Sequence, residues 1–150
     1  MNDTTAEREI VVTRLFDAPR ELVFAAFVEQ EHAVNWWVPG GTTIHEYDGR
    51  PGGVWRYSMP GPDGELYPYK VEFIEIDRPA RLVYNYGIDS EYAPEPVRTS
   101  VTFAEENGRT RVTLQLRFAT AEAREEAAQY GAAAGAQQAL RSLADYLATL

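Results

Sequence analysis

The sequence predicts an α+β fold in which a curved antiparallel sheet of about six to seven strands wraps around a long C-terminal helix. Three observations support this prediction. Residues 42–118 alternate between apolar and polar side chains over several short runs, as strands with one buried face do. Turn residues separate these runs so closely that neighbouring strands must be antiparallel. Residues 132–150 instead repeat their apolar side chains at helical spacing.

The N-terminal elements follow from local residue patterns. Residues 9–16 read EIVVTRLF, and this β-branched run predicts the first strand. A helix is predicted over residues 17–30, with Asp17 as its N-cap. A second short helix is expected over residues 31–37 and should end at the Pro-Gly-Gly run of residues 39–41. Two short helices should therefore separate the first strand from the rest of the sheet.

The remaining strands are predicted at residues 42–48, 54–59, 65–77, 81–87, 97–106 and 109–118. Asn107-Gly108 joins the last two as a tight hairpin, because both residue types tolerate positive φ. Along each strand one set of alternating positions is apolar and the other is polar. The polar face of the sheet should therefore be exposed to solvent, and the apolar face must be covered by another element.

The C-terminal segment supplies this cover. Thr120 suits the N-cap of a helix that should break at Gly131. The residues that follow carry an apolar stripe at alternating four- and three-residue spacing, made of Ala136, Leu140, Leu143, Leu147 and Leu150. A sheet curled around such a helix is a helix-grip arrangement, and residues 1–150 are expected to form a single domain.

Charge and composition argue against several classes of partner. The net charge of −9 disfavours nucleic acid and anionic membrane surfaces. No stretch approaches the roughly 18 apolar residues of a spanning helix, so no membrane insertion is expected. The absence of cysteine excludes disulfides and thiolate chemistry. Because the first residues lack the apolar run of a signal peptide, a cytoplasmic location is expected.

The polar residues do not form a recognisable catalytic or metal site. His32 and His45 lack the spacing of metal ligands. We expect His32 to lie on a helix surface and His45 to lie in a strand. The serines have no GxSxG context, and the glycine pairs do not precede a phosphate-binding helix. Glu72 is a weak acid–base candidate, since surface carboxylates are far commoner than buried ones. We therefore expect no catalytic residue, metal or cofactor.

The residues that stand out are aromatic side chains, most of them with a polar tip. They are Trp37, Trp55, Tyr57, Tyr69, Phe73, Tyr84 and Tyr86, which Ala136 and Leu140 should face from the C-terminal helix. Apolar walls with a few orienting polar groups are typical of a small-molecule pocket. A solid core is the alternative, but each buried hydroxyl would then need a protein partner. The neighbouring Trp36 should plug the junction between the short helices and the sheet.

Five stretches that together span nearly the whole chain match the motifs of one family in the same order. They are RLFDAPRELVFAAFVEQEHAVNWWVPGG, RPGGVWRYSMPGPDG, YKVEFIEIDRPARLVYNYG, RVTLQL and GAQQALRSLADYLA. Together they resemble the START-like (SRPBCC) superfamily, in the branch related to the C-terminal domain of the heat-shock-protein-90 ATPase activator. The resemblance implies a helix-grip fold with a cavity between the curved sheet and the last helix. Many members place an apolar small molecule or lipid there.

The sequence departs from this family at two positions. Where the family often has tryptophan after Gly135, this chain has Ala136, which implies a roomier cavity. Where the family often has glycine, this chain has Val71, which returns some of that volume. The two departures act in opposite directions on the size of the pocket.

Three functions follow as hypotheses. The first is non-catalytic or weakly catalytic binding of an apolar or aromatic small molecule or lipid in the cavity. The second is a protein-interaction or co-chaperone module with a protein partner, as the resemblance implies. The third is a cyclase- or hydrolase-like enzyme, which would need a set of catalytic polar residues inside the cavity, and the sequence shows no such set. A homodimer is a further expectation, because the two outer sheet edges need to be covered, but the sequence does not specify one.

Overall fold

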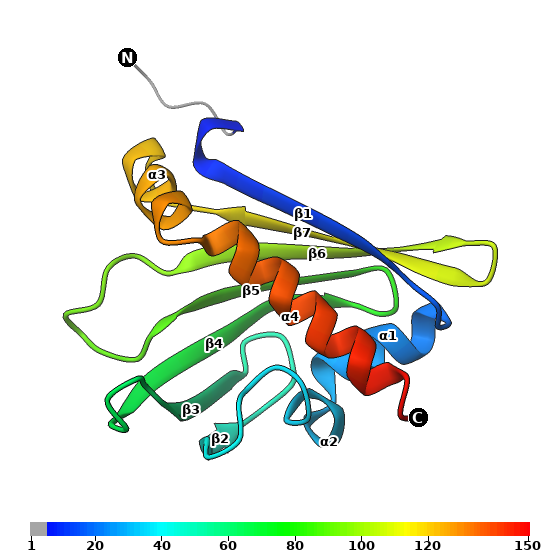
Figure 1. The fold of residues 1–150 in the computed structure, drawn as a ribbon, viewed down its shortest axis with the longest axis horizontal. Helices are drawn as coiled ribbons and strands as arrows, with labels where there is room; N and C mark the ends of the chain where they lie inside the picture. Colours follow the sequence, from blue (N-terminus) through cyan, green and yellow to red (C-terminus); the bar gives the residue numbers. More distant parts are fainter. Residues whose placement is uncertain (1–5) are drawn as a thin grey trace.

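The computed structural model describes residues 6–150, and Figure 1 shows a curved sheet with one long helix lying across it. Within these residues, seven strands form one sheet: β1 (Glu9–Phe16), β2 (Thr43–Tyr47), β3 (Val54–Pro60), β4 (Leu66–Asp77), β5 (Arg81–Ile88), β6 (Val97–Glu106) and β7 (Arg109–Arg117). The helices of this part of the chain are the 3-10 helix η1 (Ala6–Arg8), α1 (Arg20–Val28), α2 (Gln30–Ala33), α3 (Ala121–Gln129) and α4 (Ala132–Leu147).

The sheet order is β1-β7-β6-β5-β4-β3-β2, with every neighbouring pair antiparallel. Strands β2 to β7 form a meander, and β1 closes the far side by pairing with β7. Irregularities in register interrupt β2 between Ile44 and Glu46 and β4 between Phe73 and Glu75. Such bulges increase local twist and bend, which helps the sheet to curl around α4. The predicted α+β helix-grip fold is confirmed.

Asp17 does not cap α1, contrary to the sequence prediction. The N-cap is Pro19, and its carbonyl accepts hydrogen bonds from the backbone amides of Leu22 and Val23 at 3.0 and 3.1 Å. No side chain caps this helix. The start of α1 is therefore fixed by the backbone conformation of proline rather than by a side-chain acceptor.

The predicted helix over residues 31–37 is also wrong in extent, because α2 ends at Ala33 and residues 34–37 form turns. The Asn35 side-chain amide donates to the Glu31 carbonyl at 2.6 Å, while the Asn35 backbone amide donates to His32. The side chain thus takes the acceptor that a continuing helix would give to the backbone. Both tryptophans consequently follow the helix instead of lying on it.

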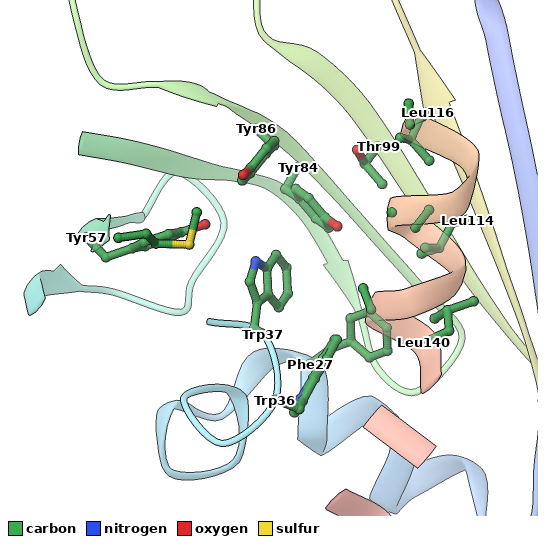
Figure 2. A pocket seen from close by; sticks show the side chains of 15 residues that line it. Phe27, Trp36, Trp37, Tyr57, Tyr84, Tyr86, Thr99, Leu114, Leu116 and Leu140 are labelled. Carbon is green, nitrogen blue, oxygen red and sulfur yellow. The ribbon is translucent and has the colours of Figure 1, made fainter. Parts of the chain in front are cut away.

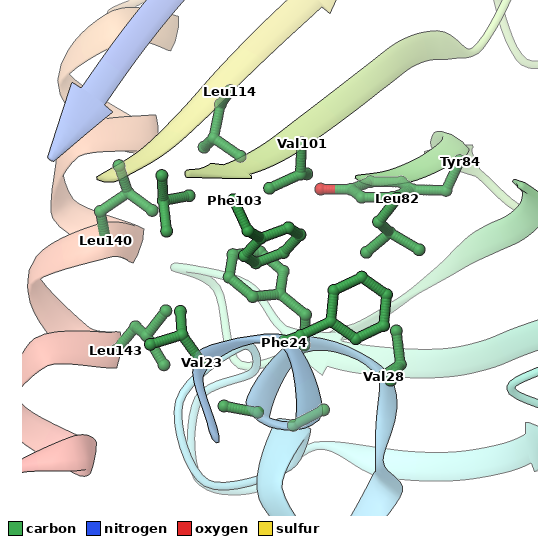
Figure 3. Packing of buried hydrophobic residues seen from close by; sticks show 14 of the residues in the cluster. Val23, Phe24, Val28, Leu82, Tyr84, Val101, Phe103, Leu114, Leu140 and Leu143 are labelled. Carbon is green, nitrogen blue, oxygen red and sulfur yellow. The ribbon is translucent and has the colours of Figure 1, made fainter. Parts of the chain in front are cut away.

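The hydrophobic core fills the space between the concave sheet face and helices α1 and α4 (Figure 3). Phe103 of β6 lies at the centre of the α1 contact, with ring centroids 4.9 Å from Phe24 and 5.3 Å from Phe27. From the other side, Leu140 and Leu143 of α4 are fully buried. The core therefore joins both helices to the same sheet face.

The C-terminal elements begin largely as predicted. The Thr120 hydroxyl accepts a hydrogen bond from the Ala123 amide at 3.0 Å, and Gly131 adopts a φ of 85° between α3 and α4. Along the predicted stripe, Ala136 and Leu147 are half-buried beside the two buried leucines. Leu150 was expected in the stripe but lies beyond the end of α4 and is 60% exposed.

Candidate functional site: a cavity beneath the last helix

A cavity of about 360 Å³ lies between the concave sheet face and α4 (Figure 2). Its lining consists of Phe27, Trp36, Trp37, Tyr57, Met59, Tyr84, Tyr86, Thr99, Leu114, Leu116, Ala132, Gly135, Ala136, Ala139 and Leu140. Small-molecule sites typically measure about 300–1,000 Å³ and have mostly apolar walls with a few polar groups. Both the size and the lining of this cavity match that description.

Small side chains on α4 create the space. Ala132, Gly135, Ala136 and Ala139 line the cavity, and their spacing places them along one side of the helix. A Cβ added at Gly135 would meet no atom within 4 Å, so this position faces open space. The helix therefore approaches the sheet closely at its buried leucines and leaves a gap along its first turns.

The two adjacent tryptophans both belong to the cavity wall. Trp36 is buried, and its indole N–H donates to the Ala26 carbonyl at 2.9 Å, which anchors the turn to α1. Trp37 is half-buried, with ring centroids 5.2 Å from Trp55 and 5.3 Å from Tyr84. Trp36 thus plugs the helix junction as predicted, but it also contributes to the lining together with Trp37.

The polar tips of three side chains meet on one side of the cavity. Figure 2 shows the Trp37 indole nitrogen and the Tyr57 and Tyr86 hydroxyls pointing toward a common region. We call these three groups the polar corner. Tyr57 is 1% exposed, and its hydroxyl has no well-oriented hydrogen-bond partner within residues 6–150, although the polar groups of Trp37 and Tyr86 lie close enough to shift its pKa, which burial chiefly raises. A buried hydroxyl without a well-oriented partner is costly, so this corner can gain a hydrogen bond from a ligand.

The tyrosine hydroxyls of the wall remain protonated over a wide pH range. Burial is the main cause and raises the pKa of Tyr57 and Tyr84 well above the ordinary tyrosine value. Burial also raises the pKa of Tyr86 to about 12, with a further contribution from Tyr69. The Thr99 side chain partly offsets the shift at Tyr84 by hydrogen bonding. At neutral pH these hydroxyls are therefore available as hydrogen-bond donors.

These pKa shifts predict alkaline destabilisation. In the unfolded chain a tyrosine ionises near pH 10, whereas Tyr57, Tyr84 and Tyr86 keep their protons in the fold above that pH. Their contribution is fully present below about pH 10 and is lost as the pH rises through the folded pKa, at about 1.4 kcal/mol per pH unit for each group. Urea unfolding between pH 8 and about pH 12 should show this decline, and Tyr86→Phe should make it shallower. An identical slope in the variant would contradict the assignment.

The structure brings together six of the nine residues predicted to line the cavity: Trp37, Tyr57, Tyr84, Tyr86, Ala136 and Leu140. Trp55 and Phe73 are instead fully buried core residues outside the lining. Tyr69 is also outside the lining, but its ring stacks between Tyr57 and Tyr86, with centroid distances of 6.1 and 5.9 Å. Tyr69 therefore lies between two wall residues and packs against the rings of both.

The sequence prediction missed the other lining residues. Leu114, Leu116 and Met59 share the apolar alternation of their strands, so the pattern placed them on the correct face without separating wall from core. The prediction does not include Thr99, because its polar side chain interrupts that alternation. Its register with Tyr84 and Leu116 places it on the same sheet face. A polar side chain at a position where the alternation predicts an apolar one is the sequence signal that identifies Thr99.

Among the described residues, no acidic side chain, basic side chain or histidine lines this site. His32 is half-buried rather than a plain surface residue, and its Nδ1 lies 2.6 Å from the Tyr146 hydroxyl, a contact that joins α2 to α4. His45 pairs with Ser58 at 2.9 Å on β2 and β3. Within residues 6–150, no group of three or more His, Cys, Asp or Glu side chains is arranged to hold a metal ion.

Across the same residues, none of the helices has the length and apolar character needed to span a membrane.

Comparisons with solved structures identify the same fold in several bacterial proteins. Protein Ms6760 from Mycobacterium smegmatis is 27% identical, with a TM-score of 0.84 over 99% of this chain and 96% of its own. A protein from Arthrobacter aurescens is 22% identical, with a TM-score of 0.85 over 99% and 91% of the two chains. Protein NE0264 from Nitrosomonas europaea is 23% identical, with a TM-score of 0.83 over 97% of each chain.

A comparison with curated proteins finds no significant match. The sequence profile of a family described as Activator of Hsp90 ATPase homolog 1-like protein matches residues 17–148. This range begins directly after β1 and runs to the end of α4, so it includes every residue that lines the cavity. The chain therefore belongs to the Activator of Hsp90 ATPase homolog 1-like family, within the START-like (SRPBCC) superfamily.

Proposed function

We propose that the protein binds an apolar or aromatic small molecule in the cavity beneath α4, without catalysis or with only weak catalysis. The family and fold suggest either a ligand-binding or a co-chaperone-type function. The cavity favours the first. The observation that carries the proposal is an aromatic space of about 360 Å³ that the chain's own side chains leave unfilled.

This space is a partly open pocket rather than a sealed void in the core. Protein interiors are close-packed and contain few voids larger than a water molecule. Here the helix places alanine and glycine where larger apolar residues would close the gap, while the facing strands contribute large aromatic rings. Such an arrangement keeps a volume open and gives it walls suited to apolar surface.

The neutral fluorescent probe N-phenylnaphthylamine tests the proposal. We expect saturable binding at one site per folded chain, with energy transfer from the wall tryptophans, because Trp36 and Trp37 both line the cavity. Native mass spectrometry with a panel of lipids and aromatic metabolites would then identify adducts. Failure of the probe and of every panel member to bind the folded protein would contradict the proposed function.

A further inference from the structure

We propose that the ligand is a neutral, largely aromatic molecule with a carbonyl oxygen, and that the polar corner of Trp37, Tyr57 and Tyr86 receives this oxygen. The inference rests on the proposed function and specifies the chemistry of its ligand. Three independent features of the wall support it: the convergence of the polar groups, the balance of donors and acceptors, and the absence of charge.

The polar corner is assembled from three separate elements. Trp37 comes from the turns after α2, Tyr57 from β3 and Tyr86 from β5, and their polar tips point toward one region (Figure 2). The pKa of the Tyr57 hydroxyl agrees with this placement: burial is the main cause of its rise, Tyr86 raises it further, and the Trp37 side chain lowers it. The parallel stack of Tyr57, Tyr69 and Tyr86, with interplanar angles of 22° and 12°, holds the two hydroxyls in place.

Three donor groups but only two accepting oxygen atoms meet in this corner. The indole contributes a donor only, whereas each tyrosine hydroxyl contributes one donor and an accepting oxygen. If the indole N–H donates to one hydroxyl, and that hydroxyl donates to the other, the last hydroxyl proton still has no acceptor in the group. The Tyr57 hydroxyl has no well-oriented hydrogen-bond partner within the described residues. The corner therefore has a donor to offer to whatever occupies the cavity, and a carbonyl oxygen is a pure acceptor.

The remaining wall selects against charged ligands. Among the described residues that line the cavity, none is Lys, Arg, His, Asp or Glu. Moving a carboxylate or an ammonium group into such surroundings without an ionic partner costs several kcal/mol. A ketone, an aldehyde or an amide places its acceptor at the corner without this cost, and its ring system can lie against the aromatic walls.

Three naphthalene probes of similar size separate these features: acetonaphthone, which has a neutral carbonyl; ethylnaphthalene, which has no acceptor; and naphthoate, which is anionic. Each is titrated by isothermal calorimetry against the wild-type protein, Tyr57→Phe and the exposed control Tyr92→Phe. Tyr57→Phe keeps the ring and removes a hydroxyl that has no well-oriented protein partner, so the fold should be retained. Tyr92 is 89% exposed and lies outside the cavity lining.

The expected result is a selective loss. Tyr57→Phe should weaken acetonaphthone about 5- to 10-fold, the value of one hydrogen bond, and change ethylnaphthalene less than about twofold. Naphthoate should bind the wild-type protein at least about tenfold more weakly than acetonaphthone. Tyr92→Phe should change none of these affinities.

The outcomes distinguish the inference from the proposed function. If ethylnaphthalene and acetonaphthone bind but respond equally to Tyr57→Phe, or if naphthoate binds as tightly as acetonaphthone, the carbonyl assignment is overturned while the binding function stands. If none of the probes binds the folded wild-type protein, the proposed function fails and this inference fails with it.

Discussion

Ala136→Trp is expected to weaken N-phenylnaphthylamine binding by at least about thirtyfold, equivalent to about 2 kcal/mol. Ala136 lines the cavity from α4 and is half-buried, so an indole at this position would project into the space that the ligand needs. Because the indole would fill an existing gap, the free energy of unfolding should be unchanged or increased.

Ala134→Trp is the matched control for this variant. Ala134 is exposed on α4 and outside the cavity lining, on the side of the helix away from Ala136. The same added side chain at Ala134 should leave the probe affinity within about twofold, since it touches no wall residue. Equal binding by both variants, measured by fluorescence titration, would place the probe somewhere other than this cavity.

Phe103→Ala is expected to lower the free energy of unfolding by about 3–5 kcal/mol. Phe103 is 2% exposed and packs against Phe24 and Phe27, so its removal leaves a void between the sheet and α1. Because Phe27 also lines the cavity, this loss links the stability of the fold to the shape of the site. Equilibrium urea unfolding with an unchanged m-value would measure the effect.

Thr102→Ala provides the comparison within the same strand. Thr102 neighbours Phe103 but its side chain points to the opposite sheet face, where it is only half-buried. Its replacement should cost about 1 kcal/mol or less, reflecting strand propensity alone. A loss for Phe103→Ala as small as that for Thr102→Ala would mean that the α1 contact contributes little to stability.

The strand pattern could be predicted because its cause is local. Alternation fixed the sheet faces, and Asn107 and Gly108 adopt positive φ of 53° and 83° in the predicted hairpin. The end of α2 was harder to predict, because the Asn35 side chain competes for a helical acceptor and periodicity does not register such a contact. The spacing predicts Leu150 in the helical stripe because the apolar pattern continues after α4 itself has ended at Leu147.

The boundary between core and cavity could not be predicted from the strands. Trp55 and Tyr57 lie on the same face of β3, yet only Tyr57 reaches the cavity lining. The difference depends on where α4 crosses the curved sheet and on the turns that carry Trp37, which are tertiary features. Alternation identifies a face, but the gap between that face and a helix depends on their packing.

The most direct test of ligand binding beneath α4 is an NMR measurement of intermolecular nuclear Overhauser effects with bound acetonaphthone. We expect contacts from the probe to the methyl groups of Leu114, Leu116 and Leu140, which line the cavity from β7 and α4. Contacts confined to exposed methyl groups, such as those of Val11 and Ile74, would contradict the account, because these residues are 54% and 39% exposed and lie outside the lining.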